Sequence, residues 1–248
     1  MTAGPLLQLD RVSKRFGSVV VAESLSLEVD AGDIVGMVGP NGAGKSSLFS
    51  LISGDLVPNA GDIRFDGRSV TRLDAAARCR LGIARTYQVP RSFEHMTVFE
   101  NVLVAAHRGA GLRGARAYEL AARVLAETEL SAEANHPASR LGLLQRKRLE
   151  LARAVGVEPR LLLLDEVAAG LTDPEVAGLV EIVSRIRARG VAVIWVEHVV
   201  RALVGFVDRL ICLAGGRFIG DGDPHAVLSS PAVREVFLGT SYGEAATS

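Results

Sequence analysis

A glycine-rich run near the start of the chain has the composition and spacing of a loop that binds phosphate groups. Glycines allow successive backbone N–H groups to turn toward one anion, and the positive end of a following helix faces the same anion. The Lys45 ammonium can reach β and γ phosphates, and the Ser46 hydroxyl can bind Mg²⁺. The run therefore predicts a nucleotide site. It fits the pattern GxxxxGK[ST] and consists of Gly39, Pro40, Asn41, Gly42, Ala43, Gly44, Lys45 and Ser46.

A second group of polar residues stands directly after an apolar run. Four leucines, 161–164, precede Asp165 and Glu166, and such a run is typical of a strand buried on both faces of a parallel sheet. Ligands of these sheets lie beyond the carboxyl ends of the strands, so both carboxylates are expected to meet the glycine-rich loop. Asp165 can then hold Mg²⁺, and Glu166 can orient or deprotonate an attacking water. Many strands end in a charged residue, so this motif indicates a nucleotide site only in combination with the glycine-rich loop.

Three further residues stand where a nucleotide would be contacted. Gln88 follows an expected strand and can bind Mg²⁺ or position water, although alone it reads equally as a surface glutamine. His198 follows the apolar run 191–196 and can hydrogen-bond a γ-phosphate, or it is a buried residue at a strand end. Phe16 can stack on a base or belong to the core. These alternatives stay open at the level of single residues.

The elements that must position these residues follow from hydrophobic periodicity and turn residues. Strand-like runs alternate with helical patterns, which predicts a parallel sheet. From 97 to 157 the pattern is helical, because Ala, Leu, Glu and Arg dominate and apolar residues recur every three or four positions. We expect an α/β core with an inserted helical block and an exposed loop from His107 to Gly114. The strands expected in the first part of the chain are Leu6 to Asp10, Val19 to Val29, Ile34 to Val38, Gly61 to Gly67 and Ile83 to Tyr87.

Composition and charge narrow the classes of protein. The chain has 248 residues with 28 basic and 28 acidic side chains, so its formal net charge is zero. This balance argues against a protein that coats nucleic acid, and we expect no nucleic-acid partner. The apolar runs are far shorter than the ~20 residues that span a bilayer, and the first residues lack the apolar region of a signal peptide. Two cysteines without metal-binding spacing favour a reducing compartment.

The assembly of these motifs resembles the ATP-binding cassette (ABC) ATPases over nearly the whole chain, from Phe16 to about Gly239. The run GPNGAGKSS, which ends in Ser47, is similar to the Walker A motif of that family, and RLLLLDE is similar to Walker B. The order and spacing of the motifs are more specific than any one of them. By position, Gln88 corresponds to the Q-loop, His198 to the H-loop and Phe16 to the aromatic residue that stacks on adenine.

The resemblance implies a P-loop NTPase fold of the ABC type in a single domain, 1–248. A parallel-sheet core with an N-terminal antiparallel β subdomain would occupy 1–89 and 158–248, and a helical subdomain would occupy 90–157. The implied activity is hydrolysis of ATP with Mg²⁺ as cofactor. The implied catalytic residues are Glu166, His198 and Gln88, the Mg²⁺ ligands are Ser46, Gln88 and Asp165, and the nucleotide contacts are Phe16 and residues 39–47.

Finer features are similar to the branched-chain amino-acid importers within this family. They are GIARTYQ, MTVFENVLVA, QRKRLELARA, AAGLT and the tail GDGDPHAVLSSPAVREVFLG. The resemblance implies a peripheral subunit on the cytoplasmic face of the inner membrane that pairs head to tail with a second ATPase around two ATP molecules. The pair would drive two integral membrane permease subunits, which receive solute from an extracytoplasmic binding protein.

Three features of the sequence depart from the family pattern. The signature loop, usually similar to LSGGQ, reads Leu141, Gly142, Leu143, Leu144 and Gln145. This loop would cap the γ-phosphate bound to the partner subunit, and a leucine side chain offers no hydrogen bond there. In addition, Val167 replaces the usual proline and Thr172 replaces Asp or Asn. A homodimer would have two damaged sites, whereas a heterodimer would keep one intact, so we expect a heterodimer.

Two other classes of function are compatible with a phosphate loop. An ATP-dependent switch that acts on nucleic acid or a soluble partner would explain the altered signature, but the neutral charge argues against it. A small-molecule kinase of the P-loop type would leave Gln88 and His198 without a role. Association with membranes separates the importer from the switch, and transfer of phosphate to an acceptor would identify the kinase.

Overall fold

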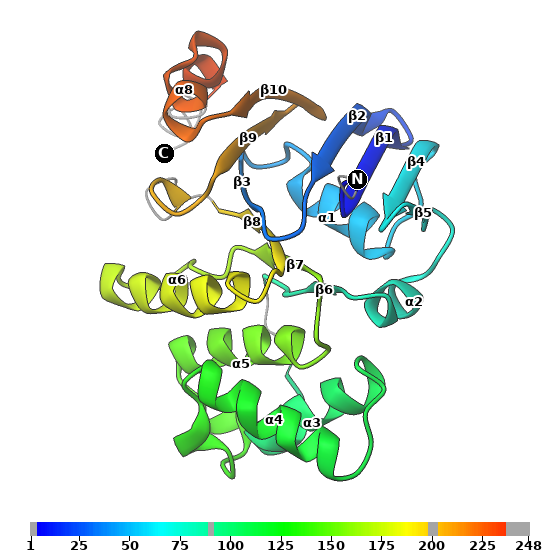
Figure 1. Cartoon of the computed structure of the whole chain (residues 1–248). Helices are drawn as coiled ribbons and strands as arrows, with labels where there is room; N and C mark the ends of the chain where they lie inside the picture. The colour runs from blue at the N-terminus through cyan, green and yellow to red at the C-terminus, as the bar shows by residue number, and fades with distance from the viewer. Residues whose placement is uncertain (1–3, 89–91, 198–202, 237–248) are drawn as a thin grey trace.

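The computed structural model describes residues 4–88, 92–197 and 203–236, which form two sheets and a layer of helices. In Figure 1 the N-terminal sheet lies beside the central sheet, and helices α3, α4 and α5 form a separate layer at the opposite end of the molecule. The structure has the expected α/β architecture, with a largely parallel core sheet and a separate antiparallel sheet. None of the described helices is both long and apolar enough to cross a membrane.

The N-terminal sheet is antiparallel, with the order β2-β1-β4-β5. β1 is longer than the expected strand, because its pairing with β2 continues from Leu7↔Val29 to Phe16↔Val19. β4 ends earlier than expected, since Asp66 and Gly67 both have positive φ and form the turn to β5. The strands are β1 (Leu7–Phe16), β2 (Val19–Val29), β4 (Ala60–Phe65) and β5 (Arg68–Ser69).

The central sheet has the order β10-β9-β3-β8-β7-β6 and is parallel except for the final hairpin of β9 and β10. Every residue of β3, β7 and β8 is buried, as expected for strands covered on both faces. β6 is shorter than expected and ends at Arg85. The strands are β3 (Ile34–Val38), β6 (Ile83–Arg85), β7 (Leu161–Asp165), β8 (Ala192–Val196), β9 (Arg209–Ala214) and β10 (Arg217–Gly222).

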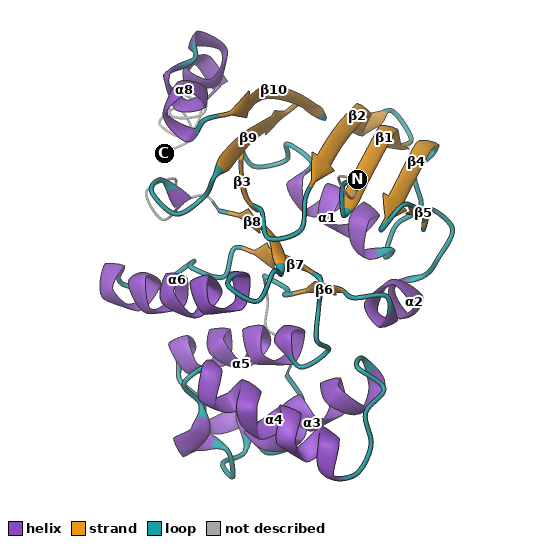
Figure 2. Ribbon diagram, in the orientation of Figure 1, coloured by secondary structure: helices purple, strands orange, loops and turns teal. Residues whose placement is uncertain are grey.

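The helices cover both faces of this sheet and build the inserted layer (Figure 2). A capping box of Thr97 and Glu100 starts α3, which continues through Arg108. The expected loop from His107 to Gly114 therefore begins only at Gly109, because His107 and Arg108 still belong to the last helical turn. The helices are α1 (Lys45–Ser53), α2 (Ala75–Arg80), α3 (Val98–Arg108), α4 (Ala115–Glu127), α5 (Leu143–Val155), α6 (Asp173–Arg187) and α8 (Pro224–Ser229), with short 3-10 helices at Ser131–Glu133 and Ala138–Arg140.

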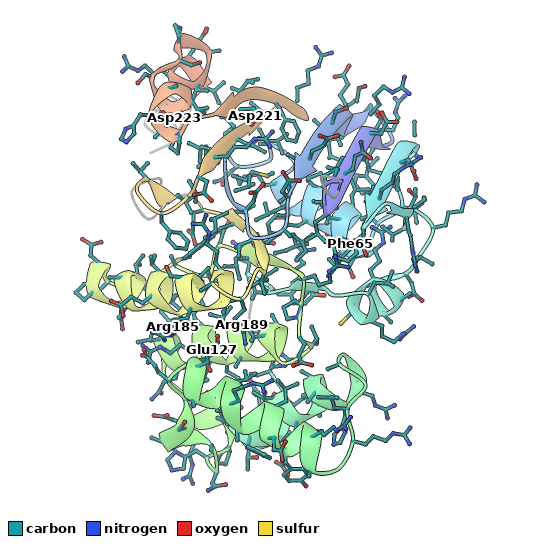
Figure 3. The ribbon with its side chains drawn as sticks, viewed as in Figure 1. Phe65, Glu127, Arg185, Arg189, Asp221 and Asp223 are labelled. Carbon is teal, nitrogen blue, oxygen red and sulfur yellow. The ribbon has the colours of Figure 1, made fainter. Side chains whose placement is uncertain are left out.

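The central sheet divides the hydrophobic core into two clusters. Successive side chains of a strand point to opposite faces, so Leu162 and Leu164 pack with the helical layer while Leu161 and Leu163 pack with α1 and the N-terminal sheet. A hydrogen bond and an ion pair add to the contact with the helical layer. Arg185 of α6 donates to the Glu127 carbonyl at 3.0 Å, and Arg189 lies 3.2 Å from the Glu127 carboxylate (Figure 3). The helical layer is therefore attached to the core through α6 as well as through α5.

Candidate active site

The glycine-rich loop connects β3 to α1 and is held against neighbouring backbone. A Cβ atom on Gly44, whose φ is +104°, would lie 2.2 Å from the Val21 carbonyl oxygen of β2. A Cβ on Gly39 would lie 2.1 Å from the Leu213 carbonyl oxygen of β9. Only glycine fits such close approaches. The loop therefore owes its shape to two strands that come from distant parts of the chain.

Lys45 is the first residue of α1, and its side chain folds back over the loop. Its Nζ donates hydrogen bonds to the Gly39 carbonyl at 2.7 Å and to the Pro40 carbonyl at 2.9 Å. Burial lowers the pKa of this ammonium, while the nearby carboxylates of Glu166 and Asp165 act in the opposite direction. An ammonium has three donors, so one remains for a phosphate oxygen.

The loop forms one wall of a cavity of about 360 Å³. Gln88 and Glu166 line the same cavity, so the structure brings together the loop, the end of the segment after β6 and the end of β7. Val21 of β2 also lines it and was not anticipated from the sequence. The lining residues are Val21, Asn41, Gly42, Ala43, Gly44, Lys45, Ser46, Ser47, Gln88 and Glu166.

Asp165 has the environment of a residue that binds a cation. Asp165 is 3% exposed, and its Oδ2 accepts a hydrogen bond from Arg85 at 2.8 Å. Its Oδ1 is buried and has no hydrogen-bond partner among the residues that the structure describes. A buried carboxylate oxygen without a donor is costly unless a cation satisfies it. Together with the exposed Ser46 at the start of α1, this donor set fits Mg²⁺, which prefers oxygen ligands.

Glu166 follows Asp165 in an unusual backbone conformation with φ of +51°. Its N–H donates to the Val196 carbonyl at 3.0 Å, and its own carbonyl accepts from Lys147 Nζ at 3.0 Å. Gln88 Nε2 donates to Glu166 Oε2 at 2.6 Å. These contacts fix the backbone on two sides and orient the carboxylate in the cavity, which is the arrangement that a base or a water-orienting group needs. The Gln88 amide oxygen is not used in this contact.

Two buried charged residues near Glu166 were missed in the sequence. Lys147 of α5 is 5% exposed, and Glu197 after β8 is 1% exposed. Glu197 Oε1 accepts from the Ala168 N–H at 2.8 Å and from Trp195 Nε1 at 3.0 Å. Burial raises the pKa of Glu197 and lowers that of Lys147, and the two charges counteract these shifts in each other. No local pattern marks either residue, since Lys147 bonds to Glu166 and Glu197 bonds to Ala168 only after the chain has folded.

Phe16, the expected adenine contact, is not among the residues that line the cavity. Phe16 ends β1 with 48% of its surface exposed, and the Lys14 ammonium lies 5.1 Å from its ring centroid. A ring in this position is accessible to a stacking partner and does not belong to the core. His198 lies outside the described residues, directly after the buried Glu197.

The signature loop forms the N-terminus of α5 on the helical layer. Leu141 is buried, Leu143 is 50% exposed and Leu144 packs partly against the core. The Gly142 N–H donates to Gln145 Oε1 at 2.9 Å, and Gln145 Nε2 donates to Glu133 at 3.0 Å. The loop therefore exposes Leu143, and its Gly142 N–H is already hydrogen-bonded to its own Gln145 side chain.

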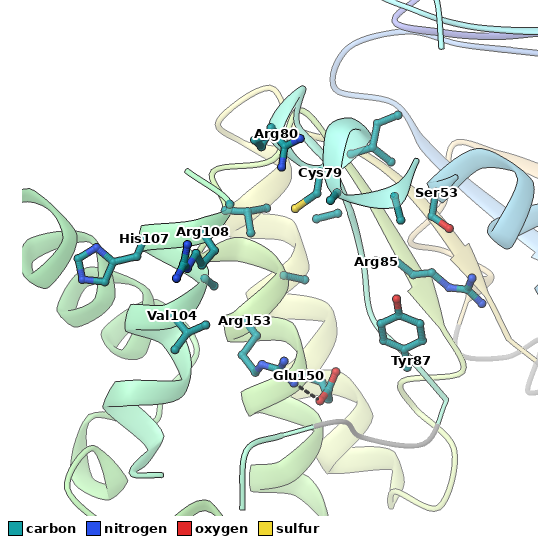
Figure 4. Close-up of a pocket in the computed structure, with 18 of the residues that line it drawn as sticks. Ser53, Cys79, Arg80, Arg85, Tyr87, Val104, His107, Arg108, Glu150 and Arg153 are labelled. Carbon is teal, nitrogen blue, oxygen red and sulfur yellow. Dashed lines mark hydrogen bonds and ion pairs between the residues drawn. The ribbon is translucent and has the colours of Figure 1, made fainter. Parts of the chain in front are cut away.

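A second, larger cavity of about 680 Å³ lies between α2, β6, α3 and α5. We call it the interlayer groove. Residues of β6 line it but do not line the nucleotide cavity. It contains alanine, valine and aromatic side chains together with Arg85 and Arg108 (Figure 4). Tyr87 and Phe93 line it from either side of residues 89–91. The sequence offered no signal for this groove.

Comparison with known proteins places this geometry in context. Residues 22–169 match the family described as ABC transporter. The chain is 36% identical to the high-affinity branched-chain amino acid transport ATP-binding protein BraF of Pseudomonas aeruginosa, with 95% of this chain and 98% of that protein covered. It is 33% identical to the lipopolysaccharide export system ATP-binding protein LptB of Acidithiobacillus ferridurans, with 96% and 98% covered. A crystal structure of the ADP conformation of an ATP-binding cassette from an ABC transporter superposes with a TM-score of 0.86 at 27% identity, with 95% and 99% covered.

Proposed function

The chain belongs to the ABC transporter family as an ATP-binding, ATP-hydrolysing subunit, and from this premise we propose that it drives import of branched-chain amino acids or a related small polar solute. The observation that carries the proposal is the cavity that joins the phosphate loop, Gln88 and Glu166, combined with relatives named for branched-chain amino acid transport. One relative is named for lipopolysaccharide export, so the relatives differ in cargo and in direction of transport. Import and the class of solute are therefore proposals.

Hydrolysis follows from the positions of this chain's own side chains. Lys45 and the loop N–H groups bind the phosphates, and Glu166, held by Gln88, orients the attacking water or accepts its proton. Ser46 and Asp165 would hold Mg²⁺, with the Gln88 amide oxygen as a third ligand. When bound, Mg²⁺ would supply neutralisation of the phosphate charge. His198 is proposed to contact the γ-phosphate, and Phe16 to stack on the adenine.

We also propose that the working unit is a heterodimer with a second ABC ATPase. The support is the N-terminus of α5, where Leu143 and Leu144 supply no polar group and Gln145 occupies the Gly142 N–H. This chain's signature loop would face ATP held by the partner, while its phosphate loop would face an intact signature loop on the partner. One site would then be competent and the other weakened.

The interlayer groove is the surface that we propose for the permease subunits. Its apolar and aromatic lining suits a short amphipathic helix, and basic side chains at the rim, such as Arg80 and Arg108, suit an acidic flank on that helix. Because Tyr87 lines the groove and the next residue, Gln88, contacts Glu166, a segment in the groove would lie one residue from the active site. Docking of this kind would place the subunit at the membrane surface without a spanning segment of its own.

The test is capture of the assembled complex. A tagged Glu166→Gln chain, expressed in its source cell and solubilised with ATP and Mg²⁺, should retain nucleotide and stay in its closed, partner-bound state. We expect a second ABC ATPase, two membrane permeases and a solute-binding protein among the captured proteins. A tagged Lys45→Ala chain is the matched control, because it should lose the nucleotide-dependent partners.

Other outcomes redirect the proposal. Capture of components of a lipopolysaccharide exporter would replace the cargo, and capture of soluble partners alone would replace transport by an ATP-dependent switch. The heterodimer is tested separately with the purified chain. Turnover by the chain alone at the level of an intact homodimer, on the order of 1 per second or faster, would contradict it.

A further inference from the structure

Arg85, the last residue of β6, is a buried arginine that lies between the nucleotide cavity and the interlayer groove. Its side chain is 9% exposed. The guanidinium carbon lies 5.7 Å from the ring centroid of Phe49 and 5.2 Å from that of Tyr87. An arginine that contacts two aromatic rings and is largely buried has little freedom to reorient, so its donors point in fixed directions.

The two ends of this guanidinium reach both proposed metal ligands. Nη2 donates to Asp165 Oδ2 at 2.8 Å. Nη1 donates to Ser50 Oγ at 2.9 Å, and the Ser50 hydroxyl donates in turn to the Ser46 carbonyl at 2.9 Å. Arg85 thus contacts one proposed ligand directly and the backbone of the other through a single hydroxyl. Groups that orient metal ligands in this way commonly set the affinity for the metal.

The same side chain lines the interlayer groove. Figure 4 shows Arg85 and Tyr87 beside each other at its edge, with Ser53 nearby. Asp55 Oδ2 lies 3.6 Å from Nη1, and Ser53 donates to that oxygen at 2.6 Å, so the polar edge of the groove is connected to Arg85 as well. Any occupant that moves Tyr87 or Asp55 changes the environment of the guanidinium.

We propose that Arg85 is a positioning residue that holds Asp165 and Ser46 in the geometry for Mg²⁺ and connects that geometry to occupation of the interlayer groove. This inference rests on the proposed function, because it takes Mg²⁺ as the cofactor and the groove as a docking surface. The Asp165 oxygen that Arg85 leaves unbonded is the one available to the cation. A lysine cannot replace the arginine, since a single ammonium on a flexible stem does not reproduce the two separate donors that reach Asp165 and Ser50.

The first experiment measures how binding of a fluorescent ATP analogue to the purified full-length chain depends on Mg²⁺. All proteins carry Glu166→Gln so that nucleotide is not consumed. Arg85→Lys and Arg85→Met are expected to raise the Mg²⁺ concentration at half-maximal effect about 10-fold, with affinity for the analogue in EDTA within about 2-fold of the parent. Arg123→Met is the matched control, because Arg123 is an exposed arginine of α4 whose side chain pairs with Glu158, away from Asp165 and Ser50. An unchanged Mg²⁺ midpoint in both Arg85 variants, or a lower one, would overturn the positioning role.

Folding is checked without metal. Arg85→Met leaves the buried Asp165 carboxylate without its cation, so its Tm in EDTA should fall, and adding Asp165→Asn should restore most of the loss. If Arg85→Met has a lowered Tm that Asp165→Asn does not restore, the arginine acts on the fold by another route and the proposed pairing is wrong. Arg85→Lys, which keeps the charge, then decides the metal effect in a stable protein.

The second experiment tests the connection to the groove. Val104→Trp fills part of the groove from α3 without touching the metal ligands. The substitution should shift the Mg²⁺ midpoint at least 3-fold when Arg85 is present and have little effect in the Arg85→Met background, because the coupling passes through that residue. Equal shifts in both backgrounds would contradict the connection. Since no permease is present in these assays, failure to capture permeases from cells would refute the docking proposal and leave the metal result standing.

Discussion

The phosphate loop and the signature loop are both glycine-containing turns that start a helix, yet they differ in what holds them. At Gly44 the backbone lies so close to the Val21 carbonyl that no side chain fits. At Gly142 φ is −69° and ψ is 175°, an extended conformation open to any residue, and the nearest atom to an added Cβ is Gln145 Oε1 at 3.6 Å. The fold of this chain therefore requires glycine at Gly44, whereas the backbone at Gly142 can accommodate other residues.

The helix ends differ in the same sense. α1 begins without a side-chain cap among the described residues, so its N–H groups remain available for a ligand. At the start of α5, the Gly142 N–H donates its hydrogen bond to the Gln145 side chain of the same helix. This difference supports the proposal that the phosphate loop is kept for this chain's own nucleotide and that the signature loop has lost polar contacts to a partner's nucleotide.

The largest effect is expected from Glu166→Gln, which removes the proposed base from the nucleotide cavity. Loss of the proposed base should lower ATP turnover of the assembled complex by roughly 10²- to 10⁴-fold, with ATP affinity unchanged, because the amide keeps the size and the contact with Gln88. Phosphate release and nucleotide binding measure the two quantities. A fall of less than 10-fold would mean that another group carries the role.

Next in size is the matched pair Gly44→Ala and Gly142→Ala. The first substitution forces a Cβ into the Val21 carbonyl at a positive φ, so the free energy of unfolding should fall by about 2–3 kcal/mol and nucleotide binding should be lost. The second replaces a helix-capping glycine by alanine and should cost no more than about 1 kcal/mol. Urea unfolding compares them. Equal costs would remove the contrast between the two loops.

The third prediction repairs the signature loop. In the assembled complex, Gly142→Ser supplies a hydroxyl and Leu144→Gly removes bulk, and each should raise ATP turnover by about 2- to 10-fold. This range corresponds to one added hydrogen bond of ~0.5–1.5 kcal/mol in the transition state. Steady-state turnover of the complex is the measurement, and the isolated chain serves as the control that should not respond. No gain from either variant would show that the loop does not limit the rate.

The smallest effect concerns Glu197. This residue and Lys147 of α5 both contact the segment around Glu166. Burial raises the folded-state pKa of Glu197 above its usual 4.5. Its contribution to stability is therefore present below the unfolded-state pKa and is lost as the pH rises through the folded-state value. Glu197→Gln should be about 1 kcal/mol more stable than the parent at pH 7 and equal to it near pH 4. Chemical unfolding at both pH values checks this, and a difference independent of pH would refute it.

Much of the fold followed from the sequence, because the buried strands and amphipathic helices have distinct periods. The order of apolar runs was enough for an α/β core with a helical insertion. Strand ends were less predictable, since the extension of β1 to Phe16 depends on pairing with β2 and the early end of β6 depends on tertiary context. His107 and Arg108 were expected in a loop because glycines follow them, but the helix ends only where Gly109 begins.

The parts of the candidate site that form one continuous motif could be predicted from the sequence. The parts that tertiary packing brings together could not. The loop of residues 39–47 is one segment, so its pattern alone pointed to phosphate. Arg85 meets Asp165 only because β6 lies beside β7, with eighty residues between them along the chain. Lys147 read as one more charge on a helix until α5 was placed against the end of β7.

The strand order has a consequence for how the protein is made. β3, which carries the phosphate loop, pairs only with β8 and β9 among the described strands, beginning at Ile34↔Val193 and Val35↔Arg209. On a ribosome that adds about 5–20 residues per second, both edges of β3 wait roughly ten to thirty seconds for their neighbours. The helical insertion relies on closer contacts and can form during this interval. Nascent chains that stop before β8 are thus left with β3 as an unpaired apolar strand, which makes them targets for chaperones rather than carriers of a working loop.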